Sequence, residues 1–168
     1  ASITMAAIAA LGGIERFVKS GANVIIKPNI CTSYHTYEYA ATTNPQVVAT
    51  LVRLCLGAGA KRVRVMDQPF GGSANSAYAK SGIADAVASA GGEMEIMNRN
   101  KYKQTPIPDG RDIKEGLFYQ DILDADVVIN VPIAKHHSLT RLTLGGKNHL
   151  GMISNPSRMH ANIGPRVA

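Results

Sequence analysis

The stretch Asn23-Val24-Ile25-Ile26-Lys27-Pro28-Asn29-Ile30 begins the pattern that decides the fold. Its nearly continuous apolar run predicts a buried β-strand. Further along, Asn44 as N-cap and Pro45 in the first turn predict a helix that runs to about Leu56. A second apolar stretch, Arg62 to Asp67, then predicts another strand. A strand, a helix and a strand in this order are typical of a parallel crossover unit.

The same alternation continues on both sides of this unit. The other predicted elements are helices at Ile3 to Phe17, Ile83 to Ala90 and Leu142 to Met152, strands at Glu93 to Met97 and Asp126 to Val131, a hairpin within Thr105 to Phe118, and a helical turn at Asp121 to Ala125. This order predicts an α/β fold with a Rossmann-like, mostly parallel sheet and helices on both faces. With 168 residues, 45% of them hydrophobic, we expect a single α/β domain over residues 1–168.

The charge balance favours anionic partners. The chain has 18 Lys and Arg residues against 12 Asp and Glu residues, which gives a net charge of +6. The tightest basic cluster, Lys61 to Arg64, alternates like the start of a strand, and the remaining charge is dispersed, so we do not expect nucleic-acid binding. No apolar run approaches the length of a membrane span.

The two cysteines, Cys31 and Cys55, are not part of a Cys-x-x-Cys motif. They cannot supply the four ligands of an iron–sulfur cluster or a four-cysteine zinc site. Cys55 lies on the apolar face of the predicted helix and is expected in the core, whereas Cys31 ends a strand and can be more exposed. We therefore expect no disulfide between them.

Polar side chains gather where the predicted strands end. Lys27 and Asn29 end the first strand, Asp67 ends the second, and Asn130 is near the end of the Asp126 to Val131 strand. In open parallel sheets, ligands bind outside the carboxyl ends of the strands. A lysine in an apolar strand needs a partner, and Asn29 or Asp67 could provide one. Asp67 itself could bind a metal or a ribose hydroxyl, or cap the next turn.

The segment after Val131 is the densest in polar groups. Lys135-His136-His137 could supply a metal ligand, a general base or a phosphate clamp. Adjacent histidines in an extended segment point in opposite directions, so at most one of them is expected to face a site. The alternative is a surface or capping role. Gly145-Gly146-Lys147-Asn148 has the chemistry of a phosphate-cradling turn, with close helix–sheet packing as the alternative.

These observations yield three sets of candidate residues. The catalytic candidates are His136, His137, Lys135 and Lys27. The candidates for binding a cofactor or ligand are Asn29, Asp67, Gly145, Gly146, Lys147 and Asn148. The candidates for a metal site are His136, His137 and Asp67.

Several of these motifs together resemble the uncharacterised family called domain of unknown function three-six-two. The motifs are Val24 to Asn29, Thr43-Asn44-Pro45, Gly57 to Asp67, Asn130-Val131-Pro132, Lys135-His136-His137 and Gly145 to Gly151. The resemblance implies that the chain is the amino-terminal portion of a longer family domain. Some members carry paired four-cysteine motifs, which this chain lacks, or a twin-arginine export signal. The resemblance therefore implies a cytoplasmic protein, or an exported one if an upstream segment carries such a signal.

The sequence indicates a site more clearly than a reaction. One class of function is an enzyme or cofactor-handling domain, whose basic cleft lined by Lys, His and Asn binds an anionic small molecule or a metal-dependent cofactor. The other is a non-catalytic binding or redox-partner module. Stabilisation by an anionic ligand through Lys27, Asp67 and Lys135 favours the first class.

Overall fold

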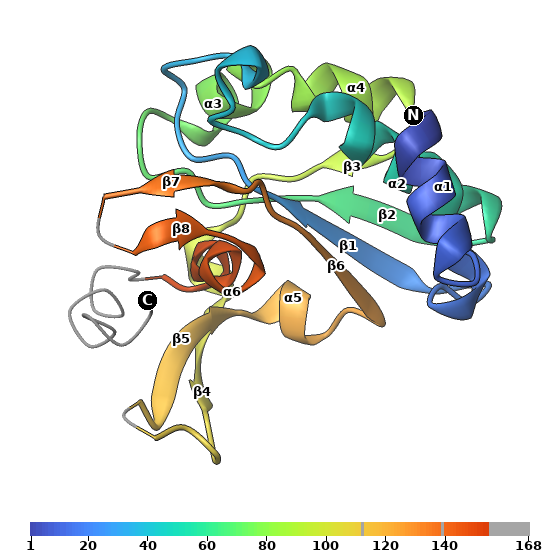
Figure 1. Cartoon of the computed structure of the whole chain (residues 1–168). Coiled ribbons are helices and arrows are strands. Elements are labelled where there is room, and N and C mark those ends of the chain that lie inside the picture. The colour runs from blue at the N-terminus through green and yellow to red at the C-terminus, as the bar shows by residue number, and fades with distance from the viewer. Residues whose placement is uncertain (112, 139, 155–168) are drawn as a thin grey trace.

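A computed structural model describes residues 1–111, 113–138 and 140–154. Its centre is a parallel sheet in the order β3-β2-β1-β6 (Figure 1). The strands are β1 (Asn23–Pro28), β2 (Arg62–Val65), β3 (Glu93–Met94) and β6 (Val127–Val131). Because β1 pairs in parallel with both β2 and β6, the predicted parallel arrangement of these strands is confirmed. The chain has the predicted Rossmann-like α/β fold.

Helices lie on both sides of this sheet (Figure 1). One side carries α2 (Pro45–Gly57), α3 (Ala74–Lys80) and α4 (Ile83–Ser89), with α1 (Ser2–Ala10) packed against α2. The other side carries α5 (Gln120–Leu123), α6 (Gly145–Asn148), and the hairpins β4–β5 (Tyr102–Pro106, Glu115–Tyr119) and β7–β8 (Lys135–His137, Arg141–Thr143). Short 3-10 helices span Ile14–Arg16, Tyr37–Tyr39, Arg99–Lys101 and His149–Met152.

Alternation along β1 decides which way Lys27 points. Val24 and Ile26 belong to the core cluster on the α2 and α4 side, whereas Ile25 belongs to a second cluster with Met66. Successive strand residues point to opposite faces. Lys27 therefore projects toward the face of Ile25, where α6 lies.

The turn before α2 ties β1 to β6. The Thr43 hydroxyl accepts a hydrogen bond from the Asn29 amide at 2.8 Å and donates one to the Val131 carbonyl at 2.7 Å. Asn44 caps α2 as predicted, accepting a hydrogen bond from the Gln46 amide at 2.8 Å. The same turn thus begins the helix and fixes the carboxyl ends of two strands.

Several predicted elements differ in the structure. The strand expected from Glu93 to Met97 is reduced to Glu93–Met94 in β3. The helix expected from Ile3 to Phe17 ends at Ala10, because Gly12 and Gly13 adopt positive φ angles that break it. The polar segment after β6 forms the antiparallel β7–β8 hairpin. The helix expected from Leu142 to Met152 is reduced to α6 and the 3-10 helix that follows it.

Other expectations are confirmed. The hairpin predicted within Thr105 to Phe118 is β4–β5, which begins earlier, at Tyr102, and ends at Tyr119. The helix α5 overlaps the helical turn predicted at Asp121 to Ala125. Cys31 and Cys55 are free thiols, and Cys55 projects from α2 into the core, where it is fully buried. Among the described residues, no helix has the length and apolarity needed to cross a membrane.

Candidate functional site

A cavity of about 460 Å³ opens at the carboxyl end of β1. β2 lies on one side of β1 and β6 on the other, so the chain reverses its direction of strand addition here. Such a switch point is where open α/β sheets bind ligands. The cavity lining includes six predicted site residues, Lys27, Asn29, Asp67, His137, Lys147 and Asn148.

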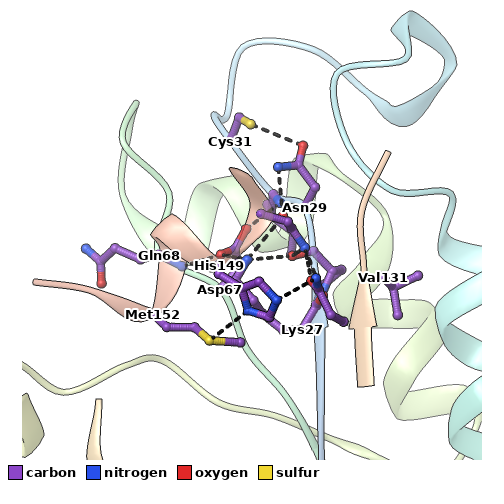
Figure 2. Close-up of polar contacts among 12 residues, drawn as sticks. Lys27, Asn29, Cys31, Asp67, Gln68, Val131, His149 and Met152 are labelled. Atoms are coloured by element: carbon purple, nitrogen blue, oxygen red, sulfur yellow. Dashed lines mark hydrogen bonds and ion pairs between the residues drawn. The ribbon is translucent and has the colours of Figure 1, made fainter. Parts of the chain in front are cut away.

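Lys27 and Asp67 form a buried ion pair at the base of the cavity (Figure 2). The Lys27 Nζ lies 2.6 Å from Asp67 Oδ1, and the side chains are 1% and 4% exposed. Lys27 Nζ also donates to the Pro28 carbonyl at 3.0 Å and to Asn148 Oδ1 at 3.2 Å. An ammonium has three donors, so Lys27 is fully satisfied within the protein.

The Asp67 carboxylate organises the backbone as well as the lysine. Its Oδ2 accepts a hydrogen bond from the Ile30 amide at 2.6 Å, and its Oδ1 accepts one from the Gln68 amide at 2.8 Å. These two bonds hold the backbone that follows β1 and the backbone that follows β2 to one carboxylate. Both carboxylate oxygens are occupied by donors of the protein.

Asn148, at the end of α6, connects β1 and β6 through the hydrogen bonds of its side-chain amide. Its Oδ1 accepts from Asn29 Nδ2 at 3.1 Å as well as from Lys27. Its Nδ2 donates to Asn130 Oδ1 at 2.7 Å. Asn130 pairs with Lys27 in the β1–β6 register and donates to the Gly145 carbonyl at 3.0 Å. These bonds hold α6 against the carboxyl ends of β1 and β6.

Gly151 allows the segment after α6 to approach the ion pair. A Cβ atom at this position would clash with Asp67 Oδ1 and lie 2.8 Å from both Lys27 Cε and Lys27 Nζ. Only a residue without a side chain fits there. By contrast, an added Cβ at Gly146 would meet no atom within 4 Å, and one at Gly145 would make an ordinary contact with Asn130 at 3.6 Å. Close packing therefore requires glycine at Gly151.

Two further lysines bring positive charge to the cavity. Lys147, in α6, is half-buried and lines it. Lys135, in β7, donates to the Ala41 carbonyl at 2.6 Å and to the Cys31 sulfur at 3.0 Å. Within the part of the chain that the structure describes, Lys147 has no hydrogen-bond partner, and neither lysine forms an ion pair.

Burial lowers the pKa of Lys147 below its ordinary value of 10.5; Cys31 opposes this shift and Lys135 adds to it. Between the lowered pKa and 10.5 the unfolded chain holds more protons than the folded one, so this group makes stability rise with pH. Lys147→Met removes the penalty for burying the charge. We therefore expect any excess in melting temperature of this variant over the wild type to shrink as the pH rises toward 10.5. If the difference in melting temperature between Lys147→Met and the wild type grew with pH, the pKa of Lys147 would not be lowered by burial.

The two candidate histidines, His136 and His137, point in different directions. His137 lines the cavity and accepts a hydrogen bond from the Thr140 amide at 3.2 Å, while His136 is exposed on the opposite face of β7. This agrees with the expectation that adjacent histidines point in opposite directions. His149 lies beside Asn130 with 3.2 Å between its Nε2 and the Asn130 Nδ2, and near Met152 (Figure 2). Burial, followed by the charge of Lys27, lowers the pKa of His149.

The candidate metal ligands His136, His137 and Asp67 have different surroundings in the described part of the chain. Across the described residues, no group of three or more His, Cys, Asp or Glu side chains is placed to hold a metal ion. His136 points away from the cavity, and Asp67 is occupied by Lys27 and two amides.

Sequence reasoning missed the roles of Cys31 and Gly151. Cys31 was identified only as the more exposed of two cysteines, and the structure places it on the cavity wall. The signal for Gly151 was its place in the polar segment, but its closeness to Asp67 depends on tertiary structure. Gly145, Gly146, His136 and Lys135 are not part of the cavity lining, although Lys135 reaches it through Cys31.

Comparisons with known proteins place the sequence among uncharacterised relatives. Residues 24–166 match the model of the family described as Domain of unknown function (DUF362). The thylakoid-associated protein sll1697 of Synechocystis sp. is 31% identical over 151 residues, which cover 90% of this chain and 44% of that relative. The chain thus spans less than half of the relative's length. No solved structure gives a significant match.

Proposed function

This chain belongs to the DUF362 family, and we propose that its cavity at the carboxyl end of β1 binds a small anionic molecule. The observation that carries the proposal is Lys147, a half-buried cation on the cavity wall with no partner among the described residues. Removing a charge from water is costly unless an opposite charge meets it. A ligand anion would supply that charge.

The balance of charges at the cavity supports this proposal. The negative charge of Asp67 is neutralised by Lys27, with which it forms an ion pair. Lys147, which lines the cavity, and Lys135, which contacts Cys31 on the lining, then remain as cations. Among the described residues no carboxylate forms an ion pair with either lysine. The cavity and its immediate surroundings therefore carry net positive charge, which attracts anions.

The size and lining of the cavity suit a small molecule. Its volume of about 460 Å³ lies within the range of small-molecule sites. Apolar side chains such as Phe70 and Leu150 line it beside the polar groups. A ligand with an apolar part and one or two carboxylate or phosphate groups would match both kinds of surface.

Lys147→Met and Lys135→Met test this proposal. Each change roughly keeps the volume but removes one charge, so we expect each to weaken anion binding about tenfold, corresponding to about 1.4 kcal/mol. The melting temperature without ligand should be nearly unchanged or raised. A thermal-shift titration with phosphate, citrate and succinate measures both quantities.

Lys61→Met is the matched control, because Lys61 is an exposed lysine just before β2, at the opposite end of the strands. This variant should bind the anions as the wild type does. If none of the anions stabilises the wild type, or if all three variants bind them equally, the proposed function is wrong. If the cavity variants unfold without a change in affinity, the lysines are structural.

A further inference from the structure

We infer that Cys31 is a nucleophilic thiol of this cavity, and that it reacts preferentially with small carboxylates that carry an electrophilic carbon. The inference rests on the proposed function, because the cations that would attract the anion also lie next to the sulfur. The Cys31 sulfur would then be a reacting atom in a cavity that otherwise only binds an anion.

Cys31 has a cation as its neighbour inside the fold. It is half-buried and lines the cavity, its Sγ accepts a hydrogen bond from the Lys135 Nζ at 3.0 Å, and as a thiol it donates to Asn29 Oδ1 at 3.2 Å. The thiolate is the attacking form, and a neighbouring ammonium attracts it. Partial exposure leaves the sulfur accessible to a molecule in the cavity.

Lys135 is held in place for this role. Its ammonium donates to the Ala41 carbonyl at 2.6 Å, which fixes it above Cys31. Lys147 lies close enough to Cys31 and Lys135 for both to influence its own ionisation. Lys147 and the Cys31 sulfur therefore both line the cavity, and Lys135, which is outside the lining, contacts the sulfur. A carboxylate could bind Lys147 while Lys135 stays with the sulfur.

An unused hydroxyl lies on the same face of the β7–β8 hairpin as Lys135. Thr143 is 2% exposed, and its Oγ1 has no hydrogen-bond partner in the described part of the chain. Thr143 is the direct cross-strand partner of Lys135. Cross-strand partners of an antiparallel pair project to the same face. The β7–β8 hairpin therefore presents a charged group and an unsatisfied polar group to the same face, and Thr143 itself lies outside the cavity lining.

Cys55 provides an internal reference. It is fully buried in α2, and burial raises the pKa of its thiol to about 11. A thiol of this kind is inert in the folded protein. The chain thus contains one thiol expected to react and one expected not to react, and peptide mapping distinguishes them.

Iodoacetate is the probe, because it combines a carboxylate with an electrophilic carbon. The sulfur lone pair of Cys31 forms the S–C bond, the C–I bond breaks, and iodide leaves with the bonding electrons. The thiol proton passes to water. Lys135 and Lys147 keep their protons and act only through their charge.

The experiment measures the alkylation rate of each cysteine in the whole chain by mass spectrometry, at pH 7 and low salt. We expect Cys31 in the folded protein to react with iodoacetate about tenfold faster than in the chain unfolded by urea. The preference for iodoacetate over neutral iodoacetamide should also exceed that of the unfolded chain, and it should fall with added salt. Cys55 should react only after unfolding.

Variants separate this inference from the proposed function. Lys135→Met and Lys147→Met should each lower the rate of Cys31 with iodoacetate, whereas Lys61→Met should not. If Cys31 reacts no faster than in the unfolded chain, or if Lys135→Met leaves the rate unchanged, the inference is wrong. If phosphate or citrate still stabilises the protein in that case, the proposed anion binding holds without the reactive thiol. If neither anion stabilises the protein, both the proposed function and the inference are wrong.

Discussion

Replacing Asp67 with Asn is expected to lower the free energy of unfolding by about 3–5 kcal/mol. The substitution keeps the shape of the side chain but leaves the Lys27 ammonium, which is 1% exposed, without a counter-charge. It also places an amide group where a carboxylate oxygen accepts a hydrogen bond from the Ile30 or the Gln68 amide. Equilibrium unfolding in urea at pH 7 measures the loss.

Glu93→Gln is the matched control for this experiment. Glu93 pairs with Arg62 through side chains that are 51% and 46% exposed. Exposed ion pairs contribute about 0–1 kcal/mol, because water screens them. If Asp67→Asn costs no more than Glu93→Gln, the Lys27–Asp67 pair does not have the structural role assigned to it.

Gly151→Ala is expected to cost about 2–3 kcal/mol of stability and to weaken anion binding. The added methyl group would clash with Asp67 Oδ1 and crowd the Lys27 ammonium, so the pair or the segment after α6 must shift. Because both border the cavity, its shape would change with them. Urea unfolding and a phosphate titration of the same samples measure the two effects.

Gly146→Ala is the corresponding control. A Cβ there would meet no atom within 4 Å, and Gly146 lies in α6, where alanine is the better helix former by up to about 1 kcal/mol. We expect this variant to be as stable as the wild type or slightly more stable. Equal losses at both glycines would mean that Gly151 has no special role in packing.

The sheet could be predicted because its signals are local. The apolar run of β1 and the Asn44–Pro45 start of α2 each have one dominant physical explanation, and the structure confirms both. The parallel order then follows from alternation of strands and helices. The clustering of polar groups at the carboxyl edge follows from the same order, since the ends of parallel strands meet at one edge.

The β7–β8 hairpin could not be predicted in the same way. Its strands contain Lys135, two histidines, Arg141 and Thr143, with no alternation of apolar and polar residues to indicate a strand. Lys135 extends from β7 to the Ala41 carbonyl and the Cys31 sulfur, in a loop far away in sequence. Contacts of this kind depend on the assembled fold.

The choice among candidate site residues was also beyond the sequence. It offered Asn29 and Asp67 as partners of Lys27, and the structure selects Asp67 for the ion pair while Asn29 binds Asn148. A carboxylate is the stronger partner of an ammonium. Which lysine of the cavity lining has no hydrogen-bond partner among the described residues depends on where α6 lies. The sequence Gly145 to Asn148 does not by itself determine the position of α6.

The separation in sequence between the two sides of the site has a consequence for how the chain folds. Lys27 and Asn148 are hydrogen-bonded across 121 residues, and Cys31 and Lys135 across 104. During synthesis β1, α2 and β2 emerge first, and the Lys27–Asp67 pair then faces water until α6 and the segment after it are made. Contacts between distant residues form late. A bound anion should therefore slow unfolding and leave the folding rate nearly unchanged.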